Sequence, residues 1–138
     1  MASNLINFCL FQLGWFICIL GAAWDHTYIA VVITLGILLL HLYLTDKNVN
    51  DIKLFALAGI FGFIFDGLMQ WNGMILYNDP GVPYPLTPIW IIVLWVLFAL
   101  TLNHSLSWLK GRVVLAAIFG ALGGPLAYVA GEKLMAVT

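Results

Sequence analysis

The sequence predicts an all-α membrane protein, a bundle of about five transmembrane helices that forms one domain over residues 1–138. Hydrophobic residues make up 64% of the chain and charged residues only 8%, whereas soluble domains are about 25% charged. The mean hydropathy is +1.07. Since one crossing takes roughly 20 apolar residues, five crossings use nearly the whole chain, and we expect any chemistry to lie within or beside the bilayer.

Each predicted span is an apolar run that ends at a polar or turn-forming segment. The polar turn at 45–51 separates the second and third runs, and Asp79-Pro80-Gly81 marks a turn before the fourth. Pro88 suits the first turn of a helix, and Lys110-Gly111-Arg112 forms the last short connection. The first run could instead be a signal peptide, but no Lys or Arg precedes it. The predicted spans are about 5–24, 27–44, 52–71, 88–109 and 113–135.

The basic residues predict the orientation. Four of them, Lys47, Lys53, Lys110 and Arg112, lie in or beside two connectors that fall on the same side when there are five spans, and Lys133 lies on the other. Because cytoplasmic loops carry the excess of Lys and Arg, we expect a cytoplasmic N-terminus and a periplasmic C-terminus. The predicted location is the bacterial inner membrane, with several passes.

Four polar side chains from three predicted helices share one layer near the cytoplasmic side: Asn7, His41, Asn103 and His104. Polar groups at membrane depth mark functional sites by default, because each costs free energy unless it is paired. One interpretation is a pocket in which His41 or His104 moves protons near neutral pH, with Asn103 beside them. The alternative is hydrogen bonding that only holds the helices together.

Asp66 lies near the outer end of the third span, about 21 Å from its cytoplasmic start at 1.5 Å per residue. A charge inside a transmembrane helix must be paired, hydrated or protonated. Asp66 is therefore either a proton carrier or ligand group facing an outer vestibule, or a hydrogen-bonded carboxylate that reaches towards water. The candidate catalytic residues are His104, Asn103, His41 and Asp66, and the candidate ligand-binding residues are Asn7, Gln12, Gln70 and Tyr128.

The fifth span carries a stripe of small residues, defined by Ala117, Ala121, Gly124, Tyr128 and Gly131 at steps of three and four, with Gly120 at its edge. Small residues let transmembrane helices approach closely. The Gly120/Gly124 stripe is therefore predicted to pack against another helix, either within the chain or in a partner, which would be another membrane protein or a second copy. The alternative is that it lines a ligand cleft.

The residue pattern argues against several classes of function. No basic run favours nucleic acid as a partner, and no motif for nucleophilic catalysis or a nucleotide or flavin cofactor is present. Two histidines make a thin ligand set for a metal, so we predict no metal and no cofactor. Cys9 and Cys18 match no metal or redox spacing and are predicted to be small buried side chains.

Three segments carry a resemblance to a known family: Asn4-Leu5-Ile6-Asn7-Phe8 to Trp15, Thr101 to Leu109, and Gly120-Ala121-Leu122-Gly123-Gly124-Pro125-Leu126-Ala127-Tyr128. With them the chain resembles a family of small proteobacterial inner-membrane proteins of unknown function. Members are often encoded beside enzymes that modify unsaturated fatty acids, including relatives of cyclopropane-fatty-acid synthase and a flavin-dependent oxidase. The resemblance implies a lipid-associated context and supplies no catalytic residue.

Three functions stay open at this point. The first is an accessory or enzyme component that modifies unsaturated acyl chains of membrane lipids. The second is a small proton-coupled transporter or exporter that uses Asp66 and the polar layer. The third is a non-catalytic scaffold. The sequence leaves open whether the protein is an enzyme.

Overall fold

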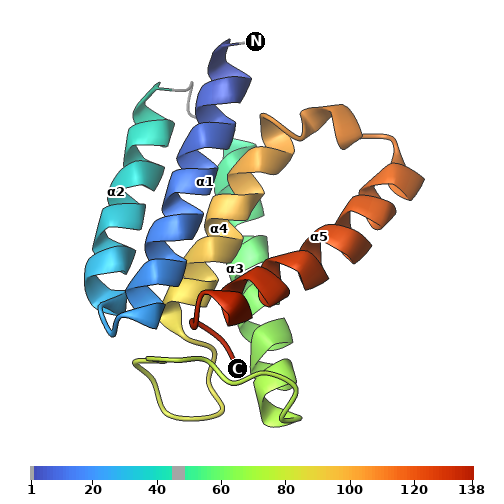
Figure 1. Ribbon diagram of the computed structural model, residues 1–138. Helices are drawn as coiled ribbons and strands as arrows, with labels where there is room; N and C mark the ends of the chain where they lie inside the picture. The colour runs from blue at the N-terminus through green and yellow to red at the C-terminus, as the bar shows by residue number, and fades with distance from the viewer. Residues whose placement is uncertain (1, 45–48) are drawn as a thin grey trace.

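The computed structural model describes residues 2–44 and 49–138. Most of these residues are helical, as the hydrophobic runs predict, and the helices follow the chain order in Figure 1. The predicted turn at 45–51, with Lys47, lies largely outside the described residues. The elements are α1 (Ala2–Ala23), α2 (Thr27–Leu44), α3 (Val49–Trp71), α4 (Ile89–Asn103), the short 3₁₀ helix η1 (Ser107–Leu109) and α5 (Val113–Lys133).

Helices α1 to α4 form a bundle, and α4 lies at its centre because it packs against the other three. Two of its large side chains, Trp90 and Leu97, are each only 1% exposed. Glycines allow the close approach of α1 to its neighbours. A Cβ atom at Gly14 would lie 2.5 Å from a methyl carbon of Leu97, and one at Gly21 would lie 2.4 Å from the Cβ of Ala30.

Four helices, α1, α2, α3 and α5, are long and apolar enough to cross a membrane. The prediction of one continuous fourth helix over 88–109 is wrong, because α4 ends at Asn103 and a turn leads to η1. At 15 residues it is about 22 Å long, less than the roughly 30 Å hydrocarbon core. Polar side chains end the helix: the Ser105 amide donates to Asn7 Oδ1 at 3.3 Å instead of continuing the α-helical pattern.

The two ends of the chain lie at opposite ends of the bundle (Figure 1). At the end opposite the N-terminus, the segment between α3 and α4 pairs with the C-terminal tail. The amide of Leu76 donates to Thr138 O, and the amide of Thr138 donates to Leu76 O, each at 2.7 Å. This pairing fixes the last residues of the chain against the connecting segment.

Helix α5 diverges from the bundle over most of its length (Figure 1). Every residue from 113 to 123 is exposed, whereas Gly131 near the other end is buried against Val137 and Ile19. Within the described residues, a Cβ atom added at Gly120 or Gly124 meets nothing within 4 Å. The expectation that the small-residue stripe packs against a helix of the same chain is therefore wrong at these two glycines.

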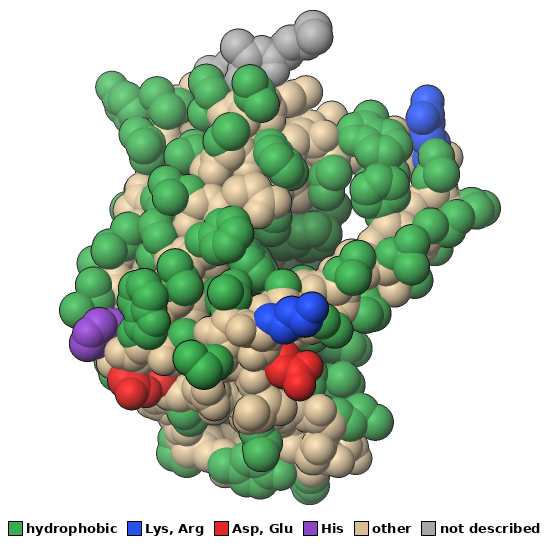
Figure 2. All heavy atoms as spheres, viewed as in Figure 1, with side chains coloured by type: hydrophobic (Ala, Val, Ile, Leu, Met, Phe, Trp, Pro, Cys, Tyr) green, Lys and Arg blue, Asp and Glu red, His purple; other side chains and the backbone are tan. Residues whose placement is uncertain are grey.

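The hydrophobic surface in Figure 2 is what a lipid environment requires. Many large apolar side chains point outward, including Val32 at 69% and Leu39 at 66% exposure, which a water-soluble protein would avoid. Cys9 also lies on this outer surface, so the expectation that both cysteines are buried holds only for Cys18. The Cys18 sulfur lies 3.3 Å from Thr34 Oγ1 inside the bundle.

Candidate functional site

Polar side chains from four helical segments converge at the end of the bundle that holds the N-terminus. Asn7 of α1 is their centre and is only 1% exposed. Its amide nitrogen donates to His41 Nε2 of α2 at 2.9 Å, and its carbonyl oxygen accepts the Ser105 hydroxyl at 2.6 Å. One asparagine thus uses both ends of its side-chain amide to join α1, α2 and the turn after α4.

A carboxylate from α3 extends this group. Asp51, in the first turn of α3, is 4% exposed and accepts a hydrogen bond from the Asn103 side chain. Asp51 Oδ2 also lies 3.8 Å from His104 Nε2, close enough for an ion pair when the imidazole is protonated. We call the whole group the Asn7 cluster, comprising Asn7, His41, Asp51, Asn103, His104 and Ser105.

The two imidazoles of the Asn7 cluster touch. The His41 and His104 rings meet edge to face, with centroids 4.9 Å apart. His41 is 2% exposed, whereas the His104 side chain is 20% exposed. His104 therefore contacts both the other imidazole and the Asp51 carboxylate.

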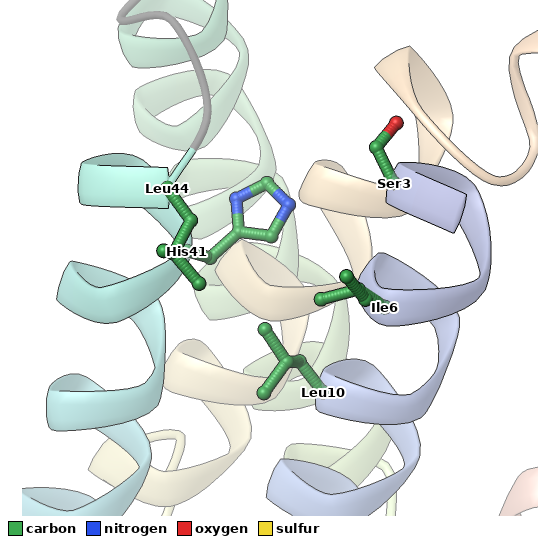
Figure 3. Close-up of a pocket in the computed structure, with 5 residues that line it drawn as sticks. All are labelled: Ser3, Ile6, Leu10, His41 and Leu44. Carbon is green, nitrogen blue, oxygen red and sulfur yellow. The ribbon is translucent and has the colours of Figure 1, made fainter. Parts of the chain in front are cut away.

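A pocket of about 170 Å³ opens beside His41 between α1 and α2. Its wall is mainly apolar, and Figure 3 shows the His41 ring extending from α2 towards α1, where Ile6 and Leu10 lie. Leu44 and Ser3 complete the lining. The pocket therefore combines a hydrocarbon-like wall with one imidazole.

A second buried cluster lies towards the opposite end of the bundle, around Asp66. This carboxylate is completely buried, with 0% exposure. One oxygen accepts hydrogen bonds from the Tyr77 and Tyr128 hydroxyls, and the other accepts the Trp95 indole N–H at 2.6 Å. The Asp66 cluster (Asp66, Tyr77, Trp95 and Tyr128) thereby joins α3, α4, α5 and the 72–88 segment. The expectation of a hydrogen-bonded carboxylate is confirmed, but the expected outer vestibule and reach to water are wrong, because these side chains cover Asp66.

Tyr77, in the segment between α3 and α4, keeps its proton firmly. Burial raises the pKa of its hydroxyl well above the ordinary value of 10.0, and the neighbouring Asp66 carboxylate raises the pKa further. Both effects oppose a second negative charge at this place. Tyr77 therefore acts as a permanent hydrogen-bond donor to Asp66.

The remaining predicted residues separate into two cases. Gln70 donates to the Leu86 carbonyl at 3.0 Å, and its own backbone carbonyl accepts the Tyr84 hydroxyl at 3.0 Å, so Gln70 holds the segment before α4. Gln12 belongs to neither cluster within the described part of the chain and is partly buried on α1. In both cases the ligand-binding role stays a prediction.

The sequence placed Asn7, His41, Asn103 and His104 in one layer, and the structure brings these four side chains together. Asp51 was missed, because a carboxylate next to a polar turn resembles a solvated surface group. Tyr77 and Trp95 were also missed as partners of Asp66. The available signal was the need for donors around a membrane-embedded carboxylate, which aromatic O–H and N–H groups nearby in the chain could supply.

The fold and these buried clusters define a multi-pass helical membrane protein. The chain belongs to the family described as "Protein of unknown function (DUF2878)", whose model matches residues 4–138. No curated protein and no solved structure matches the chain.

Proposed function

We propose that the protein binds an acyl chain of a membrane lipid beside the Asn7 cluster, as an accessory or enzyme component in the modification of unsaturated fatty acids. The observation that carries this proposal is the pocket lined by Ile6, Leu10 and Leu44, with the His41 imidazole in its wall. A small apolar pocket with one oriented polar group is the form expected of a ligand site. Its size suits a few methylene groups of a chain.

The chemistry available at this pocket is proton transfer. His41 accepts a hydrogen bond from Asn7 through Nε2, which fixes the orientation of its ring. His104 touches the same ring and faces Asp51. An imidazole can both accept and donate a proton. The group is suited to hold or pass a proton at a lipid functional group that enters the pocket.

The place of the Asn7 cluster supports access from the cytoplasmic leaflet. The start of α3, which carries Lys53, and the connection between η1 and α5, which carries Lys110 and Arg112, lie at the same end of the bundle as the cluster (Figure 1). If these residues follow the positive-inside rule, the pocket opens near the headgroups of the cytoplasmic leaflet of the inner membrane. The class of lipid, unsaturated fatty acids, comes from the family resemblance.

The transporter alternative depends on Asp66 as a proton station. Its full burial among Tyr77, Trp95 and Tyr128 supports a structural role instead, since a carrier needs a group that exchanges its partners. Asp66→Asn tests this alternative: loss of pH-dependent flux while the protein stays folded would favour transport.

Comparative lipid mass spectrometry tests the proposal directly. A strain that lacks the gene is complemented with the wild-type protein, with His41→Ala, with His104→Ala, or with the control His26→Ala at the opposite end of the bundle. Wild type and His26→Ala should restore the same profile of unsaturated acyl chains and their products. His41→Ala and His104→Ala should lose one product while protein levels stay equal. An unchanged lipid profile in the deletion strain would overturn the proposal.

A further inference from the structure

We propose that the opening between α5 and the bundle is a seat for one phospholipid, with an acyl chain along the small-residue stripe and the phosphate at Lys110 and Arg112. This site is distinct from the pocket beside His41, although the Lys110 ammonium also donates to Asn103 Oδ1 of the Asn7 cluster at 2.7 Å. The inference starts from the shape of the opening, which Figure 2 shows between the bundle and the half of α5 that begins at Val113. In a bilayer such a space is filled.

One wall of the opening is the stripe on α5. The Tyr128 hydroxyl reaches Asp66, so this face of α5 points towards the bundle. Gly124 and Ala121 lie four and seven residues before Tyr128 and share its face, since these spacings bring residues to the same side of a helix. A Cβ atom at Gly124 nevertheless meets nothing within 4 Å. The stripe thus faces the bundle across open space.

The other wall is an aromatic surface on α4 and α1. Trp95 marks the narrow end, where it donates to Asp66 beside Tyr128. Phe98, one turn along the same side of α4, is 37% exposed, and its ring centroid lies 6.2 Å from that of Phe11 on α1. Trp95, Phe98 and Phe11 offer apolar contact along this wall of the opening.

The opening narrows towards Tyr128, and this shape favours an acyl chain over a helix as its occupant. Two packed helices need about 8–10 Å between their axes, and α5 closes onto the bundle at Tyr128 and Gly131, where Val137 and Ile19 fill the contact. A flexible hydrocarbon chain fills a tapering space that a rigid helix fills only at its wide end.

The positive charges at the wide end of the opening favour a phosphate group as the lipid headgroup. Lys110 and Arg112 are both exposed at the corner between η1 and α5, and Figure 2 shows a basic side chain at the outer tip of this corner. Helix α5 begins immediately after them without a side-chain cap, so its first amides and its positive dipole end face the same corner. Cations and free amides at the mouth of an apolar space complement a phospholipid headgroup.

Native mass spectrometry with added phosphatidylglycerol tests the seat. The protein is purified in mild detergent, and the retained lipid is counted for wild type, Arg112→Ala, Gly124→Leu and Gly123→Leu. Gly123 is the matched control: it is equally open but lies about 140° around the helix from Tyr128. Wild type and Gly123→Leu should each retain one phosphatidylglycerol, whereas Gly124→Leu and Arg112→Ala should retain several-fold less. Diacylglycerol with the same chains should bind weakly, because it lacks the phosphate.

Equal retention by all four proteins, or equal binding of diacylglycerol, would overturn the proposal. A dimer without bound lipid, broken by Gly124→Leu, would overturn it in favour of a second copy in the opening. If Gly124→Leu does not fold, substitutions at the exposed Arg112 test the proposal instead: Arg112→Lys should keep the lipid and Arg112→Ala should lose it. If both Arg112 variants retain the lipid, the result would count against the proposed lipid site.

Discussion

Several of the buried polar side chains in this protein have partners from other segments of the chain. Asp66 shows the principle most clearly, because three donors from α4, α5 and the 72–88 segment surround one carboxylate. A carboxylate in hydrocarbon is costly without such donors. The same residue that would destabilise an isolated helix therefore holds the last helix of the chain to the bundle.

Replacing Asp66 by Asn should weaken the protein. An amide has one acceptor oxygen, and its NH₂ group would face an O–H or N–H donor, so at least one hydrogen bond is lost. We expect the free energy of unfolding to fall by about 1–3 kcal/mol, measured by thermal or denaturant unfolding in detergent. The control Asp25→Asn changes an exposed carboxylate and should have little effect. Equal losses in both variants would show that the Asp66 cluster contributes no specific stability.

The raised pKa of Tyr77 predicts a loss of stability at alkaline pH. The unfolded phenol ionises near 10.0, and the folded one does so only at higher pH. The favourable contribution is therefore complete below about pH 10 and is lost as the pH rises above this value, because the unfolded state then gains more from releasing the proton.

The measurement is the melting temperature between about pH 8 and pH 11, a range centred near the tyrosine pKa. Tyr77→Phe should melt lower at pH 8 but lose less stability on going to pH 11. The control Tyr43→Phe changes an 81% exposed ring and should follow the wild-type curve. Parallel curves for wild type and Tyr77→Phe would contradict the assignment.

At the scale of the helices, glycine determines which pairs approach closely. The contact between α1 and α2 depends on Gly21, whose missing side chain leaves room for Ala30. Gly36 on α2 faces open space, with nothing within 4 Å of an added Cβ atom. Comparing substitutions at Gly21 and Gly36 therefore distinguishes the effect of close helix packing from the low intrinsic helix propensity of glycine.

Gly21→Ala should destabilise the bundle and Gly36→Ala should not. Overpacking at a close helix contact costs about 1–3 kcal/mol, whereas alanine gains up to about 1 kcal/mol over glycine inside a helix. Unfolding in detergent, followed by loss of helical circular dichroism, compares the two variants. A stabilising Gly21→Ala would mean that α1 and α2 are further apart than described.

The elements also show what the residue pattern could predict. Hydrophobic runs gave the positions of α1, α2, α3 and α5 within a few residues, since the length of a crossing and the polar turns determine them. The end of α4 was not predictable from hydropathy, because it depends on long-range contacts of Asn103 and Ser105 with Asp51 and Asn7. The divergence of α5 was also missed, because a small-residue stripe signals close approach without showing whether a helix lies opposite.

For the molecule as a whole, topology decides which leaflet the Asn7 cluster faces. Five passes place the N-terminus and the η1–α5 corner on one side, and the 72–88 segment and the C-terminus on the other (Figure 1). From the positive-inside rule we expect the first side to face the cytoplasm. Accessibility of single cysteines to a membrane-impermeant reagent, in a Cys9→Ser/Cys18→Ser background, should label Asn78→Cys in intact spheroplasts and Gly111→Cys only after lysis. The reverse pattern would place the cluster in the outer leaflet.

The central claim, that an acyl chain enters the pocket beside His41, is tested most directly by cross-linking with a photoactivatable phospholipid that carries its reactive group on the acyl chain. Mass spectrometric mapping should find adducts concentrated at Ile6, Leu10 and Leu44, and Leu10→Trp, which fills the pocket, should abolish them. The outward-facing Leu39, 66% exposed on the same helix as His41, reports background labelling by bulk lipid. Adducts no more frequent at the pocket than at Leu39, or unchanged in Leu10→Trp, would contradict the account.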